Sequence, residues 1–231
     1  MPTRTAVRLR CQGILEREIR NRGYRAVAGV DEAGRGSLFG PVFAAAVVLS
    51  PERPIRGLRD SKILEAERRE ALAERIRERA EAWAVAAADA VEIDRINIYQ
   101  ASRLAMRRAI EALQPPCDYV LLDAMRVDLP LPQESLIKGD ARVQGIAAAS
   151  ILAKVARDAC IRAWDAVYPQ YGLAHHKGYS TPAHLRALRD YGPTPIHRFS
   201  YEPVRACYRY ALPPGAPPPV QAALWSEAET R

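Results

Sequence analysis

Two adjacent carboxylates, Asp31 and Glu32, follow an apolar stretch and stand directly before a glycine-rich turn, in the segment GVDEAGRGSLFGPV at residues 29 to 42. Charges of one sign repel, and holding both at the end of a half-buried strand is costly unless a cation binds them. Magnesium or manganese, which are hard divalent ions that prefer oxygen ligands, would remove that cost. An ordinary hairpin turn would be the better explanation of the Asp-Glu pair alone, and it is the less favoured explanation of the whole DEAGRG pattern.

Two further aspartates stand where the predicted elements end or begin. Asp123 closes the apolar run DYVLLDA, and Asp140 in LIKGDARV precedes a long apolar helix. Each has an ordinary explanation, since a strand-end aspartate often belongs to a turn and an aspartate before a helix is a good N-cap. Carboxylates at neighbouring strand ends and at the start of a following helix can also converge on one edge of a sheet, where metal ions bridge them.

Two segments have features that suit contact with a sugar or a phosphate. Gly34 and Gly36 leave the backbone bare on either side of Arg35, so amide groups can approach a phosphate or a sugar closely. Tyr179 stands between Gly178 and Ser180, and a ring displayed there suits stacking on a sugar or base.

Four histidines lie in the same C-terminal third of the chain. The adjacent pair His175-His176 has poor spacing for chelation and no cysteine near it, so we interpret both as loop histidines that meet phosphate or solvent rather than zinc. His184 and His197 are interpreted as structural.

The positive charge of the chain is unevenly distributed. The net charge is +7, and residues 138 to 210 hold eleven basic against five acidic side chains. This excess fits a surface that meets phosphates, although a solvated basic face explains it equally. Only four of the 34 basic residues are lysine, namely Lys62, Lys138, Lys154 and Lys177. A compact charge with three donors suits a phosphate or a neighbouring carboxylate.

The length and composition exclude several classes of protein. The 231 residues are enough for one sizeable domain, and 48% hydrophobic with 26% charged residues is a globular composition. No apolar run approaches the roughly 18 residues that a membrane span needs. We expect no signal peptide and a cytoplasmic location. The four widely spaced cysteines indicate neither a zinc site nor a disulfide framework.

The elements that must position these residues can be predicted from periodicity, caps and breakers. We expect strands at 26–31, 41–50, 83–91, 118–124 and 134–139, with the first two forming a hairpin. We expect helices at 9–22, 65–82, 93–113, 143–164 and 181–192, the last capped by Thr181 and stopped by Gly192. The order predicts an α/β fold with a mixed sheet. Residues 1–210 are assigned to one domain and 211–231 to a proline-rich, extended tail.

Taken in chain order, several segments resemble the type 2 ribonuclease H family, and specifically bacterial ribonuclease HII. They are GVDEAGRG, the DSK at 60–62, LLDA, KGD followed by AAASILAKVARD, and HKGYST with PIHRFSYEPV. The resemblance runs from about Leu15 to Val204. DEAGRG and AAASILAKV…RD together are highly specific. One departure is Ala124, where glycine is expected after the third acidic residue.

The resemblance implies a ribonuclease H-like mixed sheet with flanking helices and a small C-terminal helical part. It implies hydrolysis of the RNA strand of RNA–DNA hybrids and cleavage 5′ of single ribonucleotides in duplex DNA, leaving 3′-hydroxyl and 5′-phosphate ends. Asp31, Glu32 and Asp123 would bind Mg²⁺ or Mn²⁺, with Asp140 as the fourth acidic residue. Gly34, Arg35 and Gly36 would grip the backbone around the ribose 2′-hydroxyl, Tyr179 would pack on the following sugar, and Lys62 and Lys138 would lie near phosphate or carboxylate.

Two rival functions are compatible with parts of the sequence. A non-catalytic nucleic-acid-binding domain would explain the basic C-terminal third, but not paired carboxylates in a site meant for phosphate. A metal nuclease on the same fold could instead act on plain DNA or on junctions. We expect a monomer without a membrane partner.

The proline-rich tail ends in a second candidate motif. In QAALWSEAETR, the residues Gln221, Leu224 and Trp225 have the spacing Gln-x-x-Leu-aromatic. This spacing is similar to that of the short peptides with which replication and repair enzymes bind the bacterial sliding clamp. The alternatives are chance, or a tail whose Leu224 and Trp225 fold back onto the body.

Overall fold

The computed structural model describes residue 11 and residues 13–211. They form two compact units, which are described separately. Unit 1 contains the residues up to Ala33 together with Phe43–Ala87 and Arg103–Ala156, and unit 2 contains Gly34–Val42, Ala88–Ser102 and the residues from Arg157 onward. The assignment of 1–210 to a single catalytic domain stays a prediction, and the tail at 212–231 lies outside the described residues.

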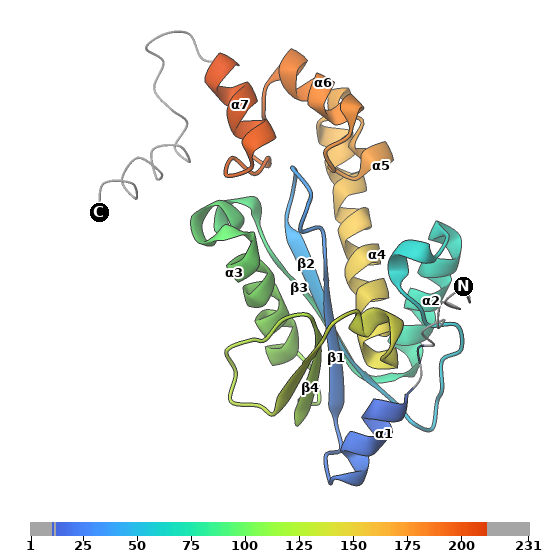
Figure 1. The fold of residues 1–231 in the computed structure, drawn as a ribbon. Helices are drawn as coiled ribbons and strands as arrows, with labels where there is room; N and C mark the ends of the chain where they lie inside the picture. Colours follow the sequence, from blue (N-terminus) through green and yellow to red (C-terminus); the bar gives the residue numbers. More distant parts are fainter. Residues whose placement is uncertain (1–10, 12, 212–231) are drawn as a thin grey trace, which may run out of the picture. The chain divides into compact units, whose positions relative to one another are not determined.

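Unit 1 is built on a mixed five-stranded sheet with the order β3-β2-β1-β4-β5. The strands are β1 (Val27–Ala33), β2 (Val42–Leu49), β3 (Ala80–Ala88), β4 (Tyr119–Asp123) and β5 (Gln133–Leu136). β1 pairs antiparallel with β2 and parallel with β4, and β4 pairs parallel with β5. Figure 1 shows β1 in the middle of this sheet. Its first five residues are all buried, which is why VAGVD lacks the alternation of a half-exposed strand.

Helices cover the sheet of unit 1, and small residues let them approach it closely. The helices are α1 (Ile14–Asn21), α2 (Ala66–Arg79), and the parts of α3 (Ala90–Glu111) and α4 (Gln144–Val167) that belong to this unit. One apolar cluster joins β2, α2 and the first half of α4 through residues that include Val47, Ile76 and Ile151. A Cβ on Gly29 of β1 would lie 2.0 Å from the carbonyl carbon of Gly145, so only glycine allows this helix so close to the strand.

Unit 2 has its own core, which is made of helices and loops. Besides the second half of α4 it contains α5 (Leu173–His176), α6 (Pro182–Tyr191) and α7 (Glu202–Ala211). Phe39, Ile161, Leu173, Leu188 and Val204 belong to its buried cluster. Short 3₁₀ turns occur at Ser61–Ile63 (η1) and Gly139–Ala141 (η2) in unit 1, and at Pro169–Tyr171 (η3) in unit 2.

The predicted α/β class and the hairpin of the first two strands are confirmed, as are the N-cap by Thr181 and the stop at Gly192. Several boundaries were wrong, by three residues at the ends of β3, β5 and α4 and at the start of α3. α2 ends at Arg79 and β3 begins at Ala80, three residues earlier than expected, because Ala80, Ala82 and Ala84 alternate inward. The described part of α1 begins at Ile14. The short helices α5 and α7 were not predicted.

Two expectations about composition can be compared with the structure. The four cysteines are free. None of the helices among residues 11 and 13–211 combines the length and apolar character that crossing a membrane requires.

Candidate active site

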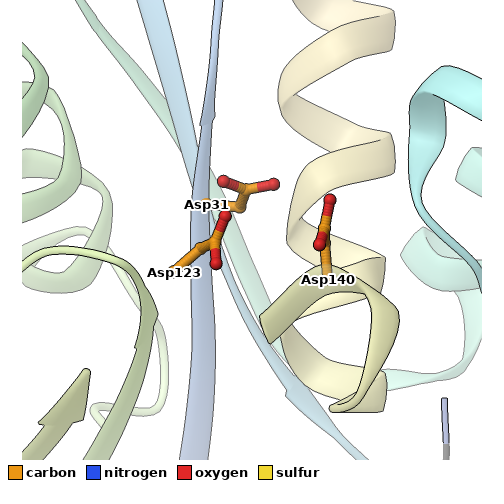
Figure 2. A group of neighbouring side chains, drawn as sticks. All are labelled: Asp31, Asp123 and Asp140. Carbon is orange, nitrogen blue, oxygen red and sulfur yellow. The ribbon is translucent and has the colours of Figure 1, made fainter. Parts of the chain in front are cut away.

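Three of the predicted acidic residues lie together at one edge of the sheet of unit 1. Asp31, Asp123 and Asp140 each offer a carboxylate oxygen, and these oxygens lie within 4.8 Å of one another. Figure 2 shows the three side chains next to one another. Asp31 comes from β1 and Asp123 ends β4, and the parallel register that matches Val30 with Leu122 brings the next residue of each strand side by side. Asp140 comes from the turn η2.

Glu32 was predicted as a ligand, but it lies outside this group of three. Successive side chains of a strand point to opposite faces, so Glu32 and Asp31 cannot both face the same way from an undistorted β1. Glu32 nevertheless acts on the group, because its charge raises the pKa of Asp31. Its role as a metal ligand stays a prediction.

The alternative interpretation of Asp140 as the N-cap of the long helix was wrong. Asp140 lies in η2, whereas α4 begins only at Gln144. The backbone N–H of Gly145 in the first turn of α4 is instead bound by Glu16, whose Oε1 accepts it at 3.0 Å. The carboxylate of Asp140 is therefore left for the acidic group.

The electrostatics of the group favour a bound cation. Asp31 is only 4% exposed, and its pKa is raised well above its usual range by burial and then by the charges of Glu32 and Asp123. The pKa of Asp140 is raised by burial and by Asp60 and Asp123. The neighbouring carboxylates make it harder for Asp31 and Asp140 to ionise, and a divalent cation with oxygen ligands would reverse that effect. The three residues therefore fit a Mg²⁺ or Mn²⁺ site.

Neutral hydrogen-bonding groups orient two of these carboxylates. The Ser150 hydroxyl hydrogen-bonds to Asp31, and its Oγ lies 2.9 Å from the Oγ of Ser61. The backbone N–H of Gly139 donates to Asp123 Oδ1 at 2.8 Å. Sequence reasoning did not find Ser61 or Ser150 as site residues, although Ser61 lies in the DSK motif and Ser150 is a polar residue within AAASILA.

The two predicted lysines differ in their surroundings. Lys62 Nζ lies 3.9 Å from Asp140 Oδ2, which agrees with the prediction that it stands near a carboxylate. Lys138 is exposed and has a left-handed backbone with φ of 56°. Its contact with phosphate stays a prediction.

The glycine turn and the predicted stacking tyrosine are neighbours within unit 2. Ser37, which follows Gly36, pairs with Tyr179 in an isolated antiparallel bridge. Tyr179 is 37% exposed, so its ring is displayed as expected. Gly34 has φ of 98°, a conformation that other residues rarely adopt.

The histidines of unit 2 are structural to a greater extent than the sequence indicated. His175 and His176 end the helix α5, so the loop assignment was wrong. His176 Nε2 lies 2.8 Å from the carbonyl oxygen of Tyr171, and its ring stacks on that of His184. His184 and His197 are fully buried, as a structural role requires.

Comparison with known proteins shows to which family the chain belongs. The model of the family described as ribonuclease HII matches residues 28–204. The chain belongs to the ribonuclease HII family. A ribonuclease HII from Solibacter usitatus is 66% identical over 205 residues, which cover 89% of this chain and 90% of that one. Membership makes the chain an endoribonuclease of the ribonuclease H class that acts on RNA–DNA hybrids.

Solved structures of related enzymes share the fold. The ribonuclease H2 of Pyrococcus horikoshii matches with a TM-score of 0.69 and 27% identity, covering 80% of this chain and 98% of that one. The ribonuclease HII in a complex with PCNA from Archaeoglobus fulgidus matches with a TM-score of 0.66 and 28% identity, covering 77% and 95%. The fold is therefore the ribonuclease H-like α/β fold.

Proposed function

We propose that this ribonuclease HII family member cleaves on the 5′ side of single ribonucleotides embedded in duplex DNA, as well as within the RNA strand of hybrids, and leaves 3′-hydroxyl and 5′-phosphate ends. The observation that carries the proposal is the group of Asp31, Asp123 and Asp140, of which Asp31 and Asp140 are buried. Such a group repels a phosphodiester unless cations are bound, so it is suited to metal-assisted hydrolysis and unsuited to simple binding.

The metal would be held by Asp31, Asp123 and Asp140, with Glu32 as a further ligand, and either Mn²⁺ or Mg²⁺ fits this oxygen-rich set. When bound, divalent ions make water nucleophilic at neutral pH and stabilise the leaving oxygen. The protein's own contribution is to hold the ligands in place. The Ser150 hydroxyl orients Asp31, the Gly139 N–H orients Asp123, and Lys62 offsets part of the charge of Asp140.

Recognition of the ribonucleotide falls in this proposal to the glycine turn and Tyr179. Telling RNA from DNA requires contact with the 2′-hydroxyl, which both donates and accepts hydrogen bonds. Backbone groups of Gly34, Arg35 and Gly36 can supply such donors and acceptors, and the half-exposed ring of Tyr179 can stack on the next sugar. Arg35 and Lys138 would contact phosphates.

One assay separates this proposal from its rivals. Purified protein is incubated with a labelled duplex DNA that carries one ribonucleotide, with Mn²⁺, with Mg²⁺ or with EDTA, beside an all-DNA duplex and a junction. We expect metal-dependent cleavage 5′ of the ribonucleotide alone, and products that a DNA polymerase can extend without further processing. Binding without cleavage would support a non-catalytic domain. Cleavage of the all-DNA duplex or the junction would support a DNA nuclease.

We also propose that the C-terminal segment binds a sliding clamp through Gln221, Leu224 and Trp225. These residues lie outside the described part of the chain, so the proposal rests on their spacing. It is supported by the related ribonuclease HII whose solved structure is a complex with PCNA. A glutamine can hydrogen-bond at a pocket rim, while a leucine and an aromatic ring fill an apolar cleft.

The clamp proposal is tested by titrating the full chain into the bacterial clamp in a calorimeter. We expect weak, micromolar binding that the double variant Leu224→Ala, Trp225→Ala abolishes, while cleavage of a short duplex stays unchanged. A titration of the intact protein without a binding signal would end this proposal.

A further inference from the structure

A fully buried arginine, Arg157, lies in unit 2 beneath the two segments to which we assign ribonucleotide recognition. Its relative exposure is 0%. Its Nη2 donates to the Ser37 hydroxyl at 2.7 Å and to the backbone carbonyl of Lys177 at 2.9 Å. One acceptor follows the glycine turn and the other precedes Gly178 and Tyr179, so a single nitrogen joins the two segments.

The glycine turn is packed directly onto the guanidinium. A Cβ placed on Gly34 would lie 2.0 Å from Arg157 Nε and 2.4 Å from its Cδ. The side chain it would strike is held by its own hydrogen bonds, so it cannot move aside cheaply. Any residue other than glycine at position 34 would therefore clash with the Arg157 side chain, in addition to being strained by the positive φ.

Tyr179 is fixed from the same group. The Arg157 guanidinium carbon lies 5.2 Å from the centroid of the Tyr179 ring, which is within the range of a cation–π interaction. Gly178 completes the link, because its carbonyl accepts the Leu38 N–H at 2.9 Å and a Cβ on it would lie 2.8 Å from Ser37 Oγ.

The placement of Arg157 is costly, which argues that it serves more than packing. Burial lowers its pKa, and its Nε and Nη1 are buried without a hydrogen-bond partner among the described residues. The Asp158 carboxylate lies 3.9 Å from Arg157 Nη1. Unpaired buried donors cost free energy that an apolar side chain of the same size would not.

We propose that Arg157 is the positioning residue for ribonucleotide recognition. It locks the Gly34–Gly36 turn and the Tyr179 ring into one arrangement, and that arrangement sets the preference for a ribonucleotide over a deoxyribonucleotide. The inference rests on the recognition role given above to these segments. Arg157 itself is buried and does not touch the substrate.

Arg157→Lys is the test, because lysine keeps the charge but replaces a planar fork by a single nitrogen that cannot hold both segments in the same way. We expect kcat for an embedded ribonucleotide to fall by about tenfold to a hundredfold, since a misplacement of about 1 Å has that effect. Mn²⁺ affinity of the nucleic-acid-free protein, measured by calorimetry, should stay within about twofold. Arg162→Lys, an exposed change on the same helix, is the matched control.

A purely structural role would lower stability without changing selectivity, and two readouts separate these cases. The first is the ratio of the cleavage rates of the duplex with one ribonucleotide and of the all-DNA duplex, which we expect to drop in Arg157→Lys. The second is a double-mutant cycle. Because Arg157 acts through Tyr179, Tyr179→Ala should cost distinctly less activity in the Arg157→Lys variant than in the wild type.

Unchanged selectivity in folded Arg157→Lys, or additive losses in the cycle, would overturn the inference. If Arg157→Lys does not fold, Ser37→Ala removes one of the two acceptors and should lower the same ratio by a smaller factor; an unchanged ratio would overturn the inference in that case. Failure of the wild type to cleave at a ribonucleotide would instead overturn the proposed function, so the two failures are distinct.

Discussion

The carboxylate of Glu16 accepts the backbone N–H of Gly145 at 3.0 Å, across 129 positions of sequence. Gly145 is the second residue of α4, and the first N–H groups of a helix have no partner within it. Glu16, which lies in α1, therefore caps the start of α4, a role for which the sequence had suggested Asp140. The same glycine approaches Gly29, two residues before Asp31 on β1. The start of α4 is thus held against the segment of β1 that leads to Asp31.

Replacing Glu16 tests this arrangement. Glu16→Ala leaves the Gly145 N–H without its acceptor, and we expect a loss of about 1–2 kcal/mol in the free energy of unfolding, the usual value of a lost cap. Glu16→Gln keeps an acceptor and should lose less. Glu18→Ala, an exposed change on the same helix, should stay within about 0.5 kcal/mol of the wild type in urea titrations. Equal effects at the two positions would contradict the capping role.

Asp31→Asn should have opposite effects on activity and on the stability of the metal-free protein. Burial and neighbouring charges raise the pKa of Asp31 above that of the unfolded chain. Its stabilising contribution is therefore full at pH below the unfolded value of about 3.9, and is lost as pH rises through the folded pKa. At pH 7 in EDTA, Asp31→Asn should therefore unfold at a higher temperature than the wild type.

The same variant should cleave more than about a hundredfold more slowly, because losing a ligand costs more than losing a group that merely orients one. Mn²⁺ should raise the unfolding temperature of the wild type and leave that of Asp31→Asn nearly unchanged. Thermal scans with EDTA and with Mn²⁺ give both comparisons. A variant that is less stable than the wild type in EDTA at pH 7 would contradict the electrostatic argument.

Ser150→Ala removes the hydroxyl that orients Asp31. We expect a tenfold to hundredfold loss of Mn²⁺ affinity, the usual effect of removing a group that orients a metal ligand. Ser102→Ala is the matched control, since this serine is also fully buried in a helix but its Oγ has no hydrogen-bond partner among the described residues. Calorimetric titration of both variants should show the loss for Ser150→Ala alone.

The sequence predicted the parts of the site that depend on local pattern. Apolar runs that end in Asp31 and Asp123 indicated neighbouring strand ends, and the structure pairs those strands in parallel. The role of Glu16 could not be predicted, because a glutamate on an amphipathic helix looks like any solvent-facing charge until α4 is placed against it. The role of Arg157 could not be predicted either, because its hydrogen-bond partners lie 120 and 20 positions away in the sequence.

Ala124 is the residue at which the sequence departs from the family pattern, and its backbone conformation should lower the free energy of unfolding. It follows Asp123 and has φ of 51°, in the left-handed region that favours glycine. Ala124→Gly should raise the free energy of unfolding by up to about 1 kcal/mol, because the left-handed strain of about 1–2 kcal/mol exceeds the entropy that glycine loses on folding. Ala124→Val should destabilise, since a β-branched residue is strained further. A stabilised Ala124→Val variant would show that the turn can change its conformation.

The last prediction concerns the buried histidine pair of unit 2, whose Nε2 atoms lie 3.1 Å apart. His197 Nδ1 accepts the Thr194 N–H at 2.9 Å, so its Nε2 must carry the proton and donate to His184. His184 Nδ1 then carries a proton and donates to the carbonyl oxygen of Tyr179 at 3.0 Å. Both rings are neutral in this series of hydrogen bonds. Each ring nitrogen already donates or accepts a hydrogen bond, so none is free to bind a further proton.

Burial lowers the pKa of His184 to about 4 and that of His197 to about 3. Because the folded values lie below the unfolded value of about 6.5, the stability that depends on the pair is full above that pH and is lost as pH falls toward 4.

Between pH 7 and pH 5 we expect His184 to account for a loss of about 1–2 kcal/mol in the free energy of unfolding. His184→Gln should reduce this pH dependence without abolishing it, because His197 remains, while His175→Gln, an exposed change, should leave it as in the wild type. Comparing slopes between variants removes the contribution of the carboxylates, which is common to both. Equal slopes for His184→Gln and the wild type would show that the pair accepts a proton without loss of the fold.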